Sequence, residues 1–142
     1  MARLPVPHVP AAEREVIGTL AMEITEQART RYELHRKTRR RILSDLGTLG
    51  KKLNQKLTAW WDLDFLAFRK EMKKVFKQDI LLAERDEWEE WLAGRRAEHE
   101  RLTTKIVHLE TQLNACVYDL FDLTPDEIQV IEESTKYRYG EV

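Results

Sequence analysis

The stretch AERDEWEEWLAGRRAEHERLTTKIVHLETQLNACVYDLF, residues 83–121, decides the fold of this chain. It contains no proline, its only glycine is Gly94, and its apolar residues recur at alternating steps of four and three. This rhythm is a heptad seam, which is typical of a long helix that packs along one side against another helix. Polar residues interrupt it at two positions. The predicted seam consists of Trp88, Leu92, Arg95, His99, Leu102, Ile106, Leu109, Leu113, Cys116 and Leu120.

Two further helices are predicted before this stretch. Residues 11–46 lack proline and carry apolar residues at helical spacing, and Gly47 and Gly50 then break the pattern. Asp64 is a suitable N-cap for a short helix that ends near Phe76. The segment between the glycines and Asp64 has no clear pattern, so residues 51–63 stay unassigned.

The end of the long helix is followed by signals for a helical corner. Thr124 and Glu127 have the spacing of a capping box, with a proline at the first helical position. Leu123 and Ile128 have the spacing of a hydrophobic staple, which sets the angle at which a chain enters a helix. A last helix is therefore predicted to fold back on the long one.

Composition agrees with an all-α protein. The 142 residues are 42% hydrophobic and 35% charged, with 5 glycines and 4 prolines, too few for a fold rich in tight turns. We expect an elongated helical hairpin or bundle with coiled-coil-like long helices. Residues 1–10 hold three prolines and are predicted to be an extended arm, 11–133 the helical domain and 134–142 a polar tail.

The sequence predicts a cytoplasmic protein. Its one cysteine, Cys116, excludes a disulfide framework and suits a reducing compartment. The first residues lack the apolar run of a signal peptide, and no segment approaches the roughly 20 apolar residues that span a bilayer. We therefore expect no membrane association.

Charge is segregated along the chain, although 24 basic and 25 acidic residues nearly cancel. Residues 29–56 hold ten basic and two acidic residues, a net charge of +8, and residues 84–100 hold seven acidic and three basic residues, a net charge of −4. The basic block either contacts a nucleic-acid backbone or is a solvated face that packs against the acidic helix. The candidate DNA-contacting residues are Arg36, Lys37, Arg39, Arg40, Arg41, Lys51, Lys52 and Lys56.

Polar residues also thin the apolar stripe of the first helix, at Arg31, His35 and Thr38. We predict that they lie at the same level as Arg95 and His99 of the long helix, because a polar layer in a coiled coil sets register. The alternative is that the heptad face is only partly covered at this level.

No catalytic centre is predicted. The four histidines lack the spacing of a helical metal pair, and the zinc, Cys-x-x-Cys and phosphate-loop motifs are all missing. Cys116 occupies a seam position and is expected to be a small core residue. The four tryptophans, at 60, 61, 88 and 91, could stack on bases but are expected to close a small core. The chain is therefore predicted to be no enzyme and to hold no cofactor or metal.

The segment 113–132 resembles the extreme C-terminal signature of large bacterial restriction-modification proteins, the adenine-specific DNA methyltransferases of type IIG and related phage-defence methylases. Their pattern runs roughly Ile-Asp-x-x-Val-Tyr-x-Leu-Tyr-Gly-Leu-Thr-x-x-Glu-Ile, then Ile or Val-Glu. Asn114 replaces its aspartate, and Phe121-Asp122 replaces Tyr-Gly. The region from Trp60 to Trp88 also resembles the helical segment before that signature. The matching residues are Val117, Tyr118, Leu120, Leu123, Thr124, Glu127, Ile128, Ile131 and Glu132.

The resemblance implies a detached helical tail module of such an enzyme. The cofactor loop and the Asn-Pro-Pro-Tyr motif of the methyltransferases do not occur, so no catalytic residue carries over. The first hypothesis is a non-enzymatic module that mediates protein association, with a methyltransferase subunit or a second copy as partner. Its candidate surfaces are the seam at Leu102, Ile106, Leu109, Leu113 and Leu120 and the corner at 117–128. The alternative is a DNA-binding accessory protein that uses residues 29–56.

Overall fold

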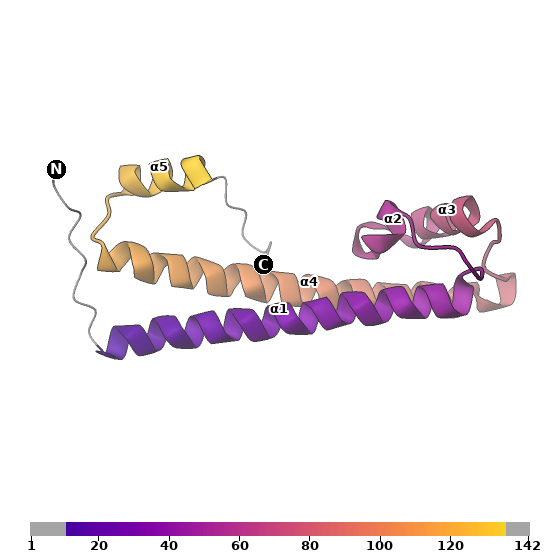
Figure 1. Ribbon diagram of the computed structural model, residues 1–142, viewed down its shortest axis with the longest axis horizontal. Coiled ribbons are helices and arrows are strands. Elements are labelled where there is room, and N and C mark those ends of the chain that lie inside the picture. Colours follow the sequence, from indigo (N-terminus) through magenta and orange to yellow (C-terminus); the bar gives the residue numbers. More distant parts are fainter. Residues whose placement is uncertain (1–10, 136–142) are drawn as a thin grey trace. The chain divides into compact units, whose positions relative to one another are not determined.

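The computed structural model describes residues 11–135, and all of its regular elements are helices (Figure 1). The predicted all-α class is thus confirmed for the described residues. The predicted arm at 1–10 lies outside them, as does the tail from residue 136 onward. No helix in this part of the chain has the length and apolarity needed to cross a membrane. The helices are α1 (Ala11–Leu46), α2 (Gln55–Thr58), α3 (Phe65–Phe76), α4 (Arg85–Leu120) and α5 (Pro125–Thr135), with 3-10 turns η1 (Trp60–Asp62) and η2 (Leu82–Glu84).

The helix boundaries follow from local signals. α1 ends before Gly47, where a Cβ atom would lie 2.3 Å from the Leu43 carbonyl oxygen, and Gly50 takes a φ of +83°. Asp64 caps α3 as predicted, because its carboxylate accepts a hydrogen bond of 2.7 Å from the Ala67 amide. In the unassigned segment, Asn54 caps α2 in the same way.

The chain divides into two compact units, and each long helix contributes to both. Unit 2 is Thr30–Leu102, and unit 1 comprises the residues before and after it. The core of unit 2 lies where the second part of α1 and the first part of α4 pack with α2, η1 and α3 (Figure 1). Its fully buried side chains include Ile42, Leu57, Trp60, Phe68, Met72, Leu92 and Leu102.

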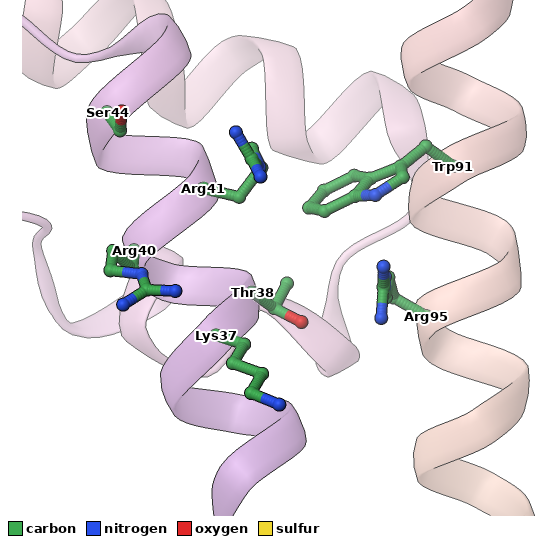
Figure 2. Close-up of a pocket in the computed structure, with 7 residues that line it drawn as sticks. All are labelled: Lys37, Thr38, Arg40, Arg41, Ser44, Trp91 and Arg95. Atoms are coloured by element: carbon green, nitrogen blue, oxygen red, sulfur yellow. The ribbon is translucent and has the colours of Figure 1, made fainter.

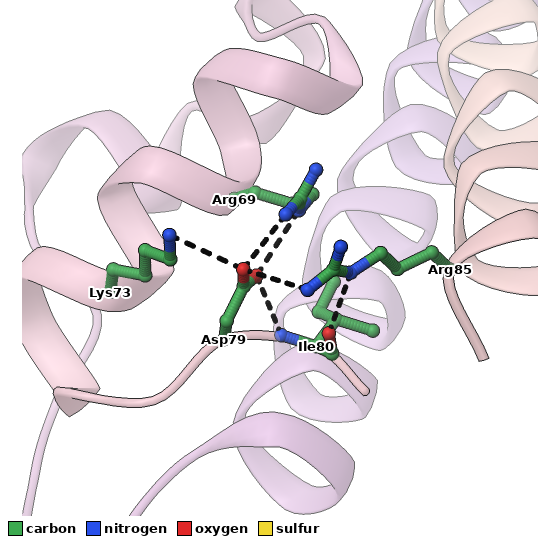
Figure 3. Close-up of polar contacts among 5 residues, drawn as sticks. All are labelled: Arg69, Lys73, Asp79, Ile80 and Arg85. Carbon is green, nitrogen blue, oxygen red and sulfur yellow. Dashed lines mark hydrogen bonds and ion pairs between the residues drawn. The ribbon is translucent and has the colours of Figure 1, made fainter. Parts of the chain in front are cut away.

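One carboxylate in unit 2 joins α3 to the start of α4 (Figure 3). Asp79 accepts two hydrogen bonds from Arg69, of 3.1 and 2.8 Å, and one of 3.0 Å from Arg85. Lys73 lies 3.3 Å away, and the Ile80 amide donates to the same carboxylate. The bonds from Arg69 above all hold the pKa of Asp79 well below its ordinary value. The loop between the two helices is therefore fixed by charge.

Unit 1 contains the predicted helical corner. The Thr124 amide donates to the Glu127 carboxylate at 3.1 Å, and the Glu127 amide donates to the Thr124 hydroxyl at 3.2 Å, which confirms the capping box. Leu123 and Ile128 are half-buried, and the Tyr118 hydroxyl lies 3.2 Å from a Glu132 carboxylate oxygen. α5 folds back along the last part of α4 (Figure 1).

The heptad seam is covered within the chain over part of its length. Leu102, Ile106 and Leu109 are at most 5% exposed, so these three side chains belong to the core and are not free for a partner. Leu113 and Leu120 are half-buried. At the predicted seam position Arg95 the side chain is exposed, whereas Leu92, the seam residue before it, is fully buried. Of the five candidate interaction residues of the seam, the two that are not fully buried thus lie toward the corner.

Candidate functional site

The structure gives the candidate basic residues different surroundings. Arg39 donates a hydrogen bond of 2.9 Å to the Thr58 carbonyl oxygen, and its guanidinium lies 5.6 Å from the ring centroid of Trp61. Arg39 therefore serves the fold of unit 2. Arg36 pairs with Glu33 at 2.9 Å on the exposed surface. Lys51 and Lys52 are exposed in the loop before α2.

Two more of these cations have acidic partners. The Lys56 ammonium lies 3.6 Å from a Glu71 carboxylate oxygen. Arg41 Nη1 lies 3.5 Å from an Asp45 carboxylate oxygen, one turn later on α1. The Arg41–Asp45 pair is exposed on both sides and so contributes little free energy, whereas the Glu71 partner of Lys56 is buried.

A cavity of about 350 Å³ lies between α1 and α4 of unit 2, and cations from both helices line it (Figure 2). Four cations line it, three from α1 and one from α4, together with two hydroxyl side chains and one indole. No carboxylate lines it among the described residues. The lining residues are Lys37, Thr38, Arg40, Arg41, Ser44, Trp91 and Arg95.

Three of these cations have no carboxylate within ion-pair distance. Within residues 11–135, Lys37, Arg40 and Arg95 form no ion pair. Glu33 attracts Lys37 and Arg40 over a longer distance, and Glu98 attracts Arg95 in the same way. The guanidinium of Arg95 lies 5.4 Å from the ring centroid of Trp91, one turn earlier on α4. Like charges that share a cavity without counter-charges create a positive potential that attracts an anion.

A second cavity, of about 330 Å³, also has Trp91 and Arg41 in its lining. Trp88 is its other aromatic side chain, and the Trp88 and Trp91 rings meet edge to face with centroids 5.1 Å apart. Two carboxylates complete the lining, those of Asp45 and Glu87. The two cavities therefore share an indole but differ in charge.

Polar side chains that interrupt the apolar stripes of α1 and α4 lie against each other in unit 2. This confirms, for His35 and His99, the predicted polar layer between the two long helices. His35 Nε2 lies 2.8 Å from His99 Nδ1, so one ring nitrogen donates its proton to the other. The Trp61 ring stacks on both imidazoles, with centroids 3.9 Å from His35 and 5.0 Å from His99. Thr38 is also buried, at 1% exposure.

Burial lowers the pKa of both imidazoles. The pKa of His35 falls to about 4, and the charges of His99, Arg39 and Arg31 reinforce the effect of burial. The pKa of His99 is lowered by burial and by Arg31, while Asp62 and Glu100 act in the opposite direction. The pair is therefore held neutral in the folded chain.

Only part of this arrangement is predicted by the sequence. Lys37, Arg40, Arg41 and Ser44 are spaced at i, i+3, i+4 and i+7, which places them on one helix face and was a readable signal. The contribution of Trp91 had no such signal, because it depends on the register of α4 against α1. Within the described residues, no group of three or more metal-ligating side chains occurs. Cys116 is half-buried.

Comparison with known proteins places the chain in a family. No curated protein and no solved structure matches it. One family model, described as a domain of unknown function (DUF8810), matches residues 10–117, which is well over half of the chain. The match includes α1, α2, α3 and most of α4, and thus all of unit 2. The chain therefore belongs to the DUF8810 family.

Proposed function

We propose that this chain is a non-enzymatic helical module that binds nucleic acid through the cationic cavity of unit 2. The observation that carries the proposal is that Lys37, Arg40 and Arg95 line one cavity and form no ion pair among the described residues. A cavity lined by charges of one sign focuses the electric field and raises the local concentration of the opposite charge. A phosphate backbone is the polyanion that such a site suits.

Further basic side chains lie on the surface near the cavity. Arg41 also lines the cavity, Arg36 is exposed next to Lys37 on α1, and Lys51 and Lys52 are exposed in the loop that follows. Exposed side chains of this kind can follow a backbone beyond one phosphate, since their ion pairs are weak. The Trp91 indole inside the cavity adds a surface for base stacking that a purely electrostatic site would lack.

Salt dependence tests this function. We expect the chain to bind labelled DNA in fluorescence anisotropy, with an affinity that falls steeply between about 50 and 200 mM salt. Joint replacement of Lys37, Arg40 and Arg95 by glutamine should weaken binding about 10- to 100-fold at low salt. It should also lower the slope of log affinity against log salt by about 2, because each phosphate contact contributes about 0.7 to 0.9.

A matched control separates a defined site from general charge. Lys70, Lys74 and Lys105 are exposed and lie outside the cavity, so their joint replacement by glutamine changes net charge equally. This control should keep most of the affinity and slope. Equal losses in the two triple variants, or no salt-dependent binding by the parent chain, would reject the proposal.

A second candidate function is association with a restriction-modification methyltransferase subunit, and the corner of unit 1 favours it. Asp122 has a φ of 49°, in the left-handed region, at the position where the resembled signature has glycine. Phe121, next to Asp122, is 51% exposed, and Val130 of α5 is 64% exposed. Exposed large apolar side chains are candidates for an interaction surface.

Sedimentation velocity tests this association. We expect the chain to form a complex with a restriction-modification adenine methyltransferase from the same cell, and joint replacement of Phe121 and Val130 by serine should weaken it at least about ten-fold. Leu82→Ser is the matched control, because Leu82 is 78% exposed but lies in unit 2. Sedimentation as a free monomer in the presence of the methyltransferase contradicts this candidate.

A further inference from the structure

We propose that the two cavities of unit 2 hold one nucleotide of a single strand, with its phosphate in the cationic cavity and its base on Trp91. This inference rests on the proposed nucleic-acid binding and narrows it to unpaired DNA or RNA. The inference depends first on Trp91, because this side chain lines both the cationic cavity and the second cavity.

Thr38 supplies the cationic cavity with a buried hydroxyl group. The residue is 1% exposed and lines the cavity, yet its Oγ1 has no hydrogen-bond partner within the described chain. Other helical threonines satisfy this group locally, since Thr25 and Thr111 each donate to the carbonyl oxygen four residues earlier. A buried hydroxyl without a partner is costly, and a phosphate oxygen would accept its proton.

The cations complete the phosphate site. Figure 2 shows Thr38 and Lys37 of α1 extending toward Trp91 and Arg95 of α4 across the space between the helices. An arginine fork and a flexible lysine ammonium together supply donors for the several oxygens of one phosphate. No lining carboxylate competes for these donors among the described residues.

Charge decides which end of a nucleotide enters which cavity. The second cavity carries the carboxylates of Asp45 and Glu87, which repel a phosphate but accept hydrogen bonds from an exocyclic amino group. Trp88 and Trp91 supply the aromatic surface on which a base stacks. The phosphate is therefore expected on the Arg95 side and the base on the Trp88 side.

The geometry favours a single strand over a duplex. A base can stack on Trp91 only when its own face is free, and in a duplex both faces are covered by neighbouring base pairs. The cations alone would not distinguish the two forms, because both carry phosphates. The preference for a single strand over a duplex therefore depends on the Trp91 indole.

The test compares an oligo(dC) strand of about 12 nucleotides with a duplex of equal length, using anisotropy and tryptophan fluorescence. We expect the parent chain to bind the strand more tightly and to show quenching of its indole emission. Trp91→Leu should weaken strand binding about ten-fold or more, and Trp91→Phe should restore most of it. Duplex binding should change little in either variant.

Thr38→Val provides a second readout. It should weaken strand binding about five-fold by removing one hydroxyl donor. The variant also loses a buried hydroxyl that has no partner, so the midpoint of its urea unfolding should equal or exceed that of the parent chain. An unchanged or higher midpoint excludes misfolding as the cause of weaker strand binding. Lys70→Gln, on the exposed face of α3, should leave strand binding unchanged.

Failure of this inference is distinguishable from failure of the proposed function. Equal affinity for strand and duplex, with no effect of Trp91→Leu, would overturn the single-strand site. Nucleic-acid binding would still be supported if the triple glutamine variant bound DNA more weakly than the parent chain. Binding of dCMP as tightly as the oligonucleotide would also overturn it, in favour of a free nucleotide. Absence of salt-dependent binding to either DNA would reject both.

Discussion

Trp60→Ala should lower the free energy of unfolding of this chain by about 4 kcal/mol, a large part of the stability of a small domain. Trp60 is completely buried in η1, and truncation would remove the largest side chain of the unit 2 core. The expected value combines the lost transfer free energy of the indole with the cost of the cavity that remains. Urea unfolding followed by circular dichroism at the helix band measures it.

The surroundings of Trp60 explain why the site cannot collapse easily. Its ring meets His35, Trp61 and His99 edge to face, with centroids 5.9, 5.6 and 6.3 Å away. These neighbours come from three different elements, so no single backbone shift can fill the space. Trp60→Ala should therefore also admit water to the histidine pair and raise the pKa of His35 toward its ordinary value.

Two further variants make the prediction specific. Trp60→Phe should cost much less than Trp60→Ala, because the Trp60 Nε1 group has no hydrogen-bond partner among the described residues and its removal leaves no acceptor unpaired. Leu81→Ala should change stability by less than about 0.5 kcal/mol, since Leu81 is 67% exposed. A loss for Leu81→Ala as large as for Trp60→Ala would contradict the assignment of the core.

The sequence predicts the helices of this chain well because their ends are marked locally. Asp64 caps α3 and Thr124 caps α5, each through bonds to residues three positions away. The glycines after α1 act over a similarly short range. The segment 51–63 could not be assigned, because its 3-10 turn depends on the burial of Trp60 among residues distant in sequence.

The candidate site was predictable only in part, and the missing information is helix register. The polar levels on α1 and α4 were visible, but their spacing does not say that His35 meets His99 rather than Arg95. The heptad seam left two alternatives, cover within the chain or by a second copy, and burial of Ile106 at 0% exposure favours the first at that level. The cationic cavity likewise exists only once Arg95 faces α1.

The histidine pair should make the stability of the chain depend on pH. We expect the free energy of unfolding to fall by about 1 to 2 kcal/mol between pH 7.5 and pH 5, because protonation must break the neutral pair. The lower end of this range reflects the partial exposure of His35, since solvent screens part of the cost. Urea unfolding followed by tryptophan fluorescence is suitable, because all four tryptophans lie in unit 2.

The direction of the effect follows from the lowered pKa of His35. Above its ordinary pKa of about 6.5, neither the folded nor the unfolded chain binds the proton, so the full stability is present. Between that value and the folded pKa of about 4, only the unfolded chain is protonated, and acidification favours unfolding. His99, whose pKa is also lowered, contributes in the same direction.

Matched variants identify the source of this pH dependence. Joint replacement of His35 and His99 by glutamine should remove most of it, because no imidazole then titrates inside unit 2. His108→Gln should leave it intact, since His108 is exposed on α4. Carboxylates are poor candidates for this pH window, because the described ones with shifted pKa values are shifted downward, away from it. Equal stability of the parent chain at pH 7.5 and pH 5 would show that the two imidazoles are not held neutral by burial.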